Sequence, residues 1–184
     1  FEKKYLVKNY LKLESKKIKP DKAKVLLIVV SIWNRYYYNY TDIVKDIIKK
    51  VGLKNLYIKD HPLSQFSDKQ FAKVYNVKSE NILSKNISLE KTLESKSNEI
   101  NLVIGPTSAS LIYSKLLGFK TICYTKMFSN DDIILYSIEY FKGINIPLIK
   151  KVNEIDDHMG YTDSVILKER PNSVPIESIF KNIC

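Results

Sequence analysis

The hydrophobic positions along the chain fall into two alternating patterns. Four short runs are almost continuously apolar and rich in β-branched residues, which is typical of strands buried in a parallel sheet. Between them, apolar residues recur every three or four positions, the spacing of an amphipathic helix. The predicted strands cover residues 24–32, 55–60, 99–105 and 119–125, and the predicted helices cover residues 43–52, 89–95, 106–118 and 130–143.

Local signals add weaker elements and some boundaries. Gly52 is expected to end the first of these helices, and Ser88 to cap the start of the second. The segment 33–40 is expected to be a loop, and the type of the segment 71–76 stays open. A helix before Pro20, a last short strand within 144–155 and a short helix over 176–181 complete the prediction.

The order of these elements predicts the fold class. Strand and helix alternate at least four times, which indicates parallel βαβ units with right-handed crossovers. We therefore expect an α/β fold with a Rossmann-like parallel sheet flanked by helices. In such sheets ligands bind beyond the carboxyl ends of the strands, so the loops that follow the strands are expected to carry the chemistry. We expect the second and third predicted strands to be neighbours that bring their trailing loops together.

Charge and composition narrow the partners. The 184 residues carry a formal net charge of +10, which favours anionic partners such as nucleic acid, anionic lipid, or an acidic small molecule or glycan. The basic residues are dispersed along the chain, which disfavours a dedicated nucleic-acid-binding arm. A coding bias toward A/T-rich codons explains the Lys, Ile, Asn and Tyr content equally well.

Cysteine usage points to a reducing compartment. Cys123 lies in an apolar run and Cys184 is the last residue, so both are interpreted as free thiols in a reducing compartment. No apolar run approaches the roughly 20 residues of a membrane span, and no secretory signal is evident. Because the first residue is Phe1, we expect this chain to be a piece of a longer protein.

One expected site is the loop after the third strand. Gly105 permits a tight exit from the strand, and Pro106 suits the first turn of a helix. Thr107, Ser108 and Ser110 place hydroxyls beside the unpaired N–H groups of the helix start, which together form an anion site suited to phosphate. The alternative is that Thr107 or Ser108 is only an N-cap.

A second expected site follows the second strand. His61 is one of two histidines, and Pro62 restricts it to an extended backbone and ends the strand. An imidazole held there can donate a proton or a hydrogen bond to an anion near neutral pH. Lys59 points to the same side if the strand continues. The alternative is a surface histidine in a proline turn.

These two loops carry a resemblance to a known family. The segment "YIKDHPLS", followed by Ser108 in "GPTSASLIYSKLLG", resembles the nucleotide-binding lobe of bacterial sialyltransferases, including the lipooligosaccharide sialyltransferases of glycosyltransferase family 52 and the polysialyltransferases. The resemblance covers roughly residues 24–124. It implies one lobe of a GT-B enzyme, with residues 21–155 as the CMP-sugar-binding domain, 1–20 as an N-terminal helix or inter-lobe segment, and 156–184 as an irregular tail.

The resemblance also implies roles for single residues. His61-Pro62 matches the family's His-Pro motif, whose histidine contacts the CMP phosphate and acts as acid toward the leaving group. Ser108 matches the first of two phosphate-binding hydroxyls, while Ala109 stands where the family often has Ser or Thr, so Thr107 or Ser110 would supply the second. Glu90 resembles a carboxylate that holds the cytidine, or is a solvated helix residue. Asp42 resembles the catalytic base, or is an N-cap.

The implied activity is an inverting, metal-independent transfer of sialic acid from CMP-sialic acid to a glycan acceptor of a lipooligosaccharide or capsule. We expect a cytoplasmic protein with a possible peripheral contact to an anionic membrane, and no nucleic-acid partner. The alternatives are a GT-B transferase with another nucleotide-sugar donor, and a non-catalytic basic domain that binds polyanions. The aromatics of residues 33–40 would be stacking groups in a polyanion-binding domain. They are equally interpreted as core residues or as contacts between lobes. Asp156, Asp157, His158 and Asp163 show no established metal-ligand spacing.

Overall fold

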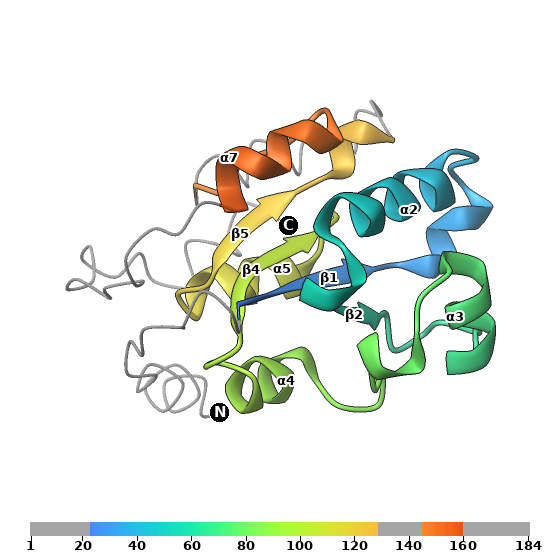
Figure 1. Ribbon diagram of the computed structural model, residues 1–184, viewed down its shortest axis with the longest axis horizontal. Coiled ribbons are helices and arrows are strands. Elements are labelled where there is room, and N and C mark those ends of the chain that lie inside the picture. Colours follow the sequence, from blue (N-terminus) through green and yellow to red (C-terminus); the bar gives the residue numbers. More distant parts are fainter. Residues whose placement is uncertain (1–22, 129–144, 160–184) are drawn as a thin grey trace, which may run out of the picture.

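The computed structural model describes residues 23–128 and 145–159 (Figure 1). The predicted helices over 2–17, 130–143 and 176–181, together with Cys184 and Asp163, lie outside the described residues. Five parallel strands form one sheet in the order β3-β2-β1-β4-β5. The strands are β1 (Lys24–Val29), β2 (Leu56–Asp60), β3 (Ile82–Leu83), β4 (Ile100–Gly105) and β5 (Lys120–Cys123).

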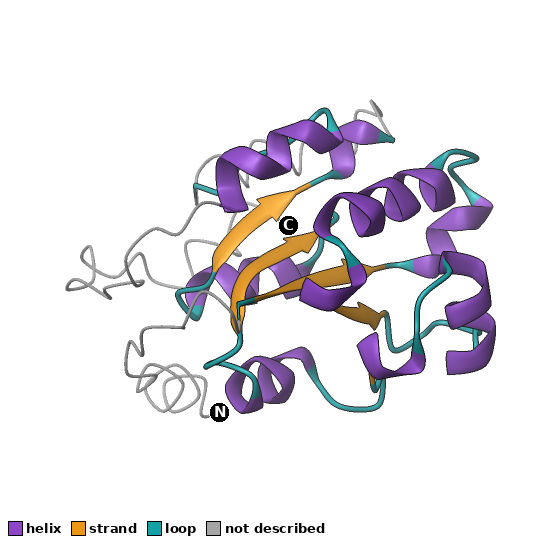
Figure 2. Ribbon diagram, in the orientation of Figure 1, coloured by secondary structure: helices purple, strands orange, loops and turns teal. Residues whose placement is uncertain are grey.

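Helices and short 3₁₀ turns connect the strands (Figure 2). The α-helices are α2 (Tyr40–Val51), α3 (Asp68–Tyr75), α4 (Leu89–Ser95), α5 (Ala109–Leu116) and α7 (Asp156–Met159). The 3₁₀ turns cover Ser31–Arg35, Leu53–Asn55, Ser79–Asn81, Thr125–Met127 and Val152–Ile155. The predicted α/β fold with a Rossmann-like parallel sheet is confirmed.

The strand order places β1 at the centre of the sheet. The chain adds β2 and β3 on one side of β1 and then crosses to the other side to add β4 and β5. Beyond β5, Leu148 forms a single parallel bridge with Cys123, so the predicted last strand within 144–155 is reduced to one bridge. As a consequence, β1 lies between the strand that leads to His61 and the strand that leads to Ser108.

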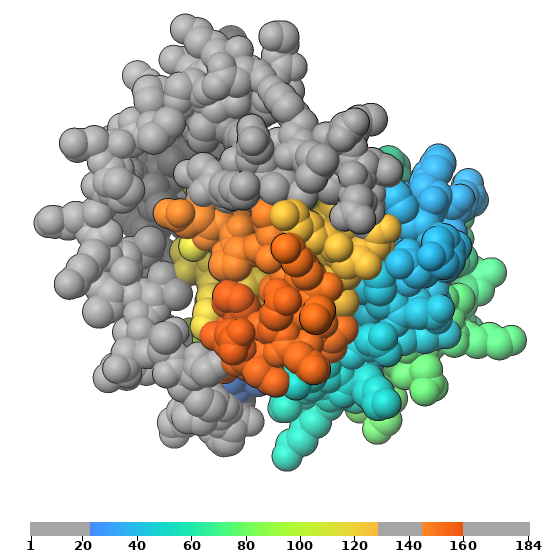
Figure 3. All heavy atoms as spheres, turned by 90° about the horizontal axis from the view of Figure 1, so that it is seen from above, coloured from blue at the N-terminus to red at the C-terminus, as the bar shows by residue number. Residues whose placement is uncertain are grey.

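The alternating side chains of β1 show how the sheet builds two cores. Val25, Leu27 and Val29 face the layer made by α2, α3 and the segment 149–155, whereas Leu26 and Ile28 face α4 and α5. All five side chains are buried, as expected for a central parallel strand covered on both faces. In Figure 3, residues 145–159 lie against the α2 region, and Lys50 forms an ion pair with Asp156 there.

Three segments differ from the sequence expectation or were left open by it. The undecided segment 71–76 is the end of α3, which starts at a capping box between Ser67 and Gln70 and ends at Asn76 in a left-handed conformation with φ of 52°. The two-residue strand β3 was not predicted, because two half-buried residues are too short to show periodicity. Residues 156–159, expected to begin an irregular tail, form α7.

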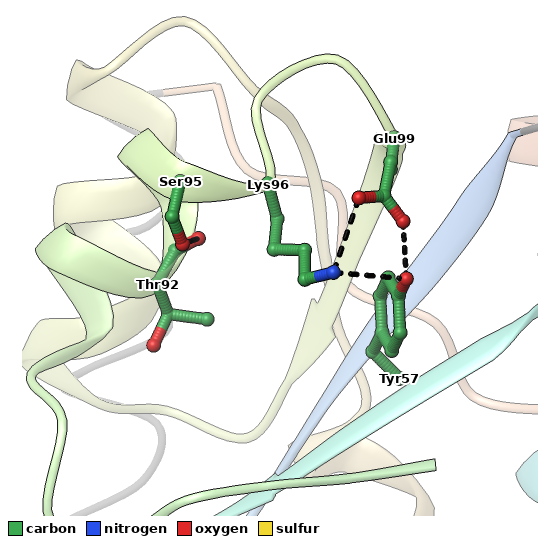
Figure 4. A network of polar contacts seen from close by, with 5 residues as sticks. All are labelled: Tyr57, Thr92, Ser95, Lys96 and Glu99. Carbon is green, nitrogen blue, oxygen red and sulfur yellow. Dashed lines mark hydrogen bonds and ion pairs between the residues drawn. The ribbon is translucent and has the colours of Figure 1, made fainter. Parts of the chain in front are cut away.

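The opposite, amino-terminal edge of the sheet holds a compact polar cluster (Figure 4). The Tyr57 hydroxyl donates to the Glu99 carboxylate, and the Lys96 ammonium lies 3.1 Å from the other Glu99 oxygen and 3.3 Å from the Tyr57 hydroxyl. The Lys96 ammonium also lies 4.9 Å from the centre of the Tyr57 ring. This cluster joins the start of β2 to the turn before β4 and lies away from the loops expected to carry chemistry.

Candidate functional site

The loops that follow the strands gather at one edge of the sheet, called here the carboxyl edge: residues 30–39, 61–67, 84–88, 106–108 and 124–128. His61 and Ser108 both lie at this edge, as parallel strands require. However, β2 and β4 are not neighbours, so the expectation that adjacent strands bring the two residues together is wrong. Two strand spacings put the strand axes about 10 Å apart, with β1 between them.

The carboxyl edge also contains the point where the chain reverses its winding. The helix after β1, α2, covers one face of the sheet, and the helix after β4, α5, covers the other. In open α/β sheets, ligands bind where two neighbouring strands send their connections to opposite faces. The ends of β1 and β4 form this switch point, with the loop 106–108 on one side of the β1 end and His61 on the other.

The start of α5 clarifies the roles of its hydroxyls. The Ser108 oxygen accepts the Leu111 N–H at 3.4 Å, so Ser108 is the N-cap of α5, and its role in phosphate binding stays a prediction. The N–H and the hydroxyl of Thr107 both donate to the Thr125 oxygen, at 2.7 and 3.0 Å. The Ser110 hydroxyl and the N–H groups of Ala109 and Ser110 have no hydrogen-bond partner among the described residues. Of the two residues left open, Ser110 therefore has the available hydroxyl.

Gly105 determines how closely α5 approaches the sheet. A Cβ atom at this position would lie 3.1 Å from Leu111 Cδ1 and 3.3 Å from Ile28 Cβ. A larger residue would therefore require Leu111 and Ile28 to shift by a few tenths of an ångström. Pro106 is buried in the loop before the N-cap, so the expectation that it lies in the first turn of the helix is wrong.

His61 has a defined tautomer at the end of β2. The strand ends at Asp60, and the half-buried imidazole accepts the Leu63 N–H at Nδ1, at 3.1 Å. Because Nδ1 acts as an acceptor, the neutral ring carries its proton on Nε2. Nε2 has no hydrogen-bond partner among the described residues. Pro62 is exposed in the turn that follows.

Asp60 is a polar residue that sequence reasoning missed. Its side chain is only 6% exposed, and its carboxylate accepts the N–H of Ser31 at 3.1 Å, the hydroxyl of Ser31 at 2.7 Å and the N–H of His61 at 2.8 Å. The Ser64 hydroxyl lies 2.7 Å from the Ser31 oxygen and extends this chain. A carboxylate at the last position of a predicted buried strand was the signal that could have identified it.

Two lysines tie neighbouring loops of the carboxyl edge together. The buried Lys59 ammonium donates to the carbonyls of Ser84 and Ile87 at 2.6 and 2.7 Å. Burial lowers the pKa of Lys59, while Asp60 and Glu90 oppose the change. Lys85 donates in turn to the carbonyls of Ser64 and Phe66 at 2.9 and 2.8 Å. Lys59 is therefore placed to hold the loop after β3.

The two predicted carboxylates take different places. Asp42 is exposed in the first turn of α2 at the carboxyl edge; it is not the N-cap, since Asn39 precedes the helix. Glu90 is half-buried in the first turn of α4, and its charge reaches Lys59. Because β2 and β1 separate β3 from β4, Glu90 follows a strand three positions away from the one that leads to Ser108.

The aromatic residues of the loop after β1 are mostly packing groups. Trp33 and Tyr37 contact the Phe128 ring, with ring centres 5.4 and 5.0 Å apart, and Tyr40 is fully buried. Tyr36 and Tyr38 are 71% and 97% exposed. The core alternative is thus confirmed for Tyr40, whereas ligand stacking or lobe contact by the exposed Tyr36 and Tyr38 stays a prediction.

The described residues contain neither a metal-binding cluster nor a helix able to span a membrane. No group of three or more His, Cys, Asp or Glu side chains that could hold a metal ion occurs within residues 23–128 and 145–159. In the same two ranges, no helix combines the length and the apolar character needed to cross a bilayer.

Together, the fold and this edge define an α/β protein with a Rossmann-like parallel sheet and a polar switch point. Comparisons with protein-family models, curated proteins and solved structures give no significant match. The chemistry of the carboxyl edge is therefore the basis for assigning a function.

Proposed function

We propose that this chain is the donor-binding lobe of a sialyltransferase, which transfers sialic acid from CMP-sialic acid to a glycan acceptor of a bacterial lipooligosaccharide or capsule. The observation that carries the proposal is the pair of donors on either side of the β1 end: the Nε2–H of His61 and the open N-terminus of α5. The motif resemblance supplies the identity of the donor, since the same two positions bind the CMP phosphate in the sialyltransferase family.

The start of α5 would hold the phosphate of CMP. The free N–H groups of Ala109 and Ser110 point out of the helix start, where the helix dipole favours negative charge. The Ser110 hydroxyl adds a donor, and the Ser108 cap fixes the first turn. Thr107 contributes through its bonds to Thr125, which hold the loop at the end of β5.

His61 would act on the leaving group. As the bond between sialic acid and CMP breaks, negative charge grows on the phosphate oxygen that leaves. A hydrogen bond or a proton from Nε2–H stabilises that charge, and preorganised donors of this kind are often the largest single contribution to catalysis. The proposal requires no metal ion.

The remaining residues have supporting roles in the proposal. Asp42, exposed at the carboxyl edge, would take the proton of the acceptor hydroxyl, and Glu90 would contact the cytidine. Lys59 would hold the loop after β3 rather than contact phosphate directly, because its ammonium already donates to two carbonyls. The net charge of +10 suits an anionic donor and supports peripheral contact with the inner face of an anionic membrane.

A calorimetric titration of the full chain with CMP, CMP-sialic acid, UDP and GDP tests the donor class. We expect CMP and CMP-sialic acid to bind and the other two nucleotides to bind at least tenfold more weakly. The second histidine offers a matched control: His61→Gln should lower transfer by about 10²- to 10⁴-fold, as expected for loss of an acid catalyst. His158→Gln, in α7, should leave transfer unchanged.

Other results would identify the rival functions. Tighter binding of UDP or GDP would indicate a different nucleotide-sugar donor. Salt-dependent binding to polyanions without affinity for CMP would indicate a non-catalytic domain. Equal transfer by the His61→Gln variant and the wild-type chain would remove His61 from the mechanism.

A further inference from the structure

We propose that Asp60 is a positioning residue that, with Ser31, holds His61 in its Nε2–H tautomer and at a fixed place relative to the start of α5. This inference rests on the proposed function, because it gives His61 a partner within that reaction. It goes beyond the His-Pro motif, since it concerns the residue before the histidine and a serine at the end of another strand.

The first observation behind this inference is that the Asp60 side chain is buried. Its carboxylate is nearly removed from solvent, and none of the ion pairs among the described residues includes it. A buried carboxylate needs compensating hydrogen bonds, and here three donors supply them: the N–H and hydroxyl of Ser31 and the N–H of His61. The side chain therefore connects the end of β1 to the end of β2.

The turn after β2 continues this connection to the imidazole. The Ser31 hydroxyl donates to Asp60, so the Ser64 hydroxyl donates to Ser31. The Ser64 N–H donates to the His61 carbonyl at 2.9 Å, which closes the turn that carries Leu63. The Leu63 N–H then occupies Nδ1 of the ring. Asp60 thus fixes both ends of the short turn that selects the tautomer.

The same network of hydrogen bonds extends to the loop before α5, on the far side of β1. The residue before Ser31, Val30, donates its N–H to the Tyr40 hydroxyl at 2.9 Å. Tyr40 contacts the hydroxyl of Tyr124, whose N–H donates to the Gly105 carbonyl at 3.1 Å. Buried hydrogen bonds therefore run across the carboxyl edge from His61 to the loop before α5. Asp60 is the residue that joins His61 to this network of hydrogen bonds.

The alternative is that Asp60 only stabilises the fold. The ring tautomer separates the two roles, because a purely structural carboxylate has no reason to select the protonated nitrogen of a neighbouring ring. Nitrogen-15 NMR of the labelled full chain, with His61 assigned by comparison with the His158→Gln variant, reads this directly. In the wild-type chain we expect one neutral tautomer with an unprotonated Nδ1.

The test compares Asp60→Ala, Asp60→Asn and Asp68→Asn. In Asp60→Ala we expect averaged ring resonances from both tautomers, and a fall in kcat of roughly tenfold to a hundredfold, as for a reacting group misplaced by about an ångström, with KM changed less. Asp60→Asn keeps an acceptor for the His61 N–H and should restore much of the single-tautomer signal and much of kcat. Asp68, exposed in the first turn of α3, is the matched control and should behave like the wild-type chain.

A folded Asp60→Ala variant that keeps the single Nε2–H tautomer would overturn the inference. If that variant does not fold, Ser31→Ala takes its place, since it removes one hydroxyl from the same chain: mixed tautomers support the inference and one tautomer overturns it. The result is separable from the proposed function. A wild-type chain that shows the tautomer but neither binds CMP nor transfers sialic acid would contradict the function and leave the positioning of His61 intact.

Discussion

The hydroxyls of Tyr40 and Tyr124 lie 2.8 Å apart at the end of the central strand, and both side chains are fully buried. Tyr124 donates to the Ile28 carbonyl at 3.2 Å, and Tyr40 accepts the Val30 N–H. The pair therefore satisfies one backbone group near the end of β1 and one just after it.

Removing the Tyr40 hydroxyl is expected to destabilise the protein. In Tyr40→Phe the Val30 N–H becomes a buried donor without an acceptor, so the free energy of unfolding should fall by about 1–3 kcal/mol. Urea denaturation measures this change. Tyr38→Phe, at a 97% exposed ring two positions earlier, is the matched control and should stay within about 0.5 kcal/mol of the wild-type value. Equal losses in the two variants would contradict the role assigned to the pair.

The same pair predicts a loss of stability at alkaline pH. Burial raises the pKa of both Tyr40 and Tyr124 well above the unfolded value of about 10. A group whose pKa is raised in the folded state stabilises the protein fully below the unfolded pKa and loses that contribution as the pH rises toward the folded pKa. The free energy of unfolding should therefore fall above about pH 10, and the fall should be shallower in Tyr40→Phe. Tyrosinate absorbance that rises only with unfolding would check the assignment.

Lys59→Met separates a loop-holding role from phosphate binding. Loss of the ammonium leaves the carbonyls of Ser84 and Ile87 without their donor, so amide hydrogen exchange in residues 84–88 should accelerate. The dissociation constant for CMP should change by less than about threefold, an amount below 1 kcal/mol. Lys54→Met, at an exposed position before β2, is the control for loss of charge. A large loss of CMP affinity with unchanged exchange would instead favour direct contact with phosphate.

The polar cluster at the amino-terminal edge should affect stability slightly and binding not at all. The pKa of Glu99 is lowered, and the hydrogen bond from Tyr57 is the main cause. The stability that the Glu99 carboxylate contributes is therefore present above its unfolded pKa and is lost as the pH falls. Because the ion pair with Lys96 is partly exposed, Glu99→Gln should cost no more than about 1 kcal/mol near neutral pH. CMP affinity, measured in parallel, should be unchanged. A weaker affinity would mean that the two edges of the sheet are coupled.

The sequence alone predicted the parts of the fold that depend on strong periodicity. The apolar runs that became β1, β2, β4 and β5 are buried on both faces, and this burial is what makes them nearly continuous in sequence. The Ser88 cap was also predictable, because a serine before a helical pattern has a local physical role. In contrast, β3 contains two residues and depends on tertiary contacts with β2 alone.

Strand order was the main feature of the site that local patterns could not provide. Nothing near His61 or Ser108 indicates that β1 separates their strands, because pairing is decided by contacts across the whole sheet. The partners of Lys59 and Thr107 were hidden for the same reason: Ser84 and Thr125 lie 25 and 18 positions away in sequence. The roles of His61, Ser108, Glu90 and Asp42 in sialyl transfer stay predictions until the binding and transfer experiments are done.

The short strand β3 has a consequence for how copies of this protein behave when crowded. It pairs with only Ile58 and Lys59 of β2, and the Asn81 side chain donates to the Leu53 and Leu56 carbonyls, at 2.7 and 2.8 Å, where a longer strand would have run. An outer strand of two residues offers almost no ladder for a foreign strand to extend. This side of the sheet is therefore guarded against intermolecular strand addition, the step that begins many forms of aggregation.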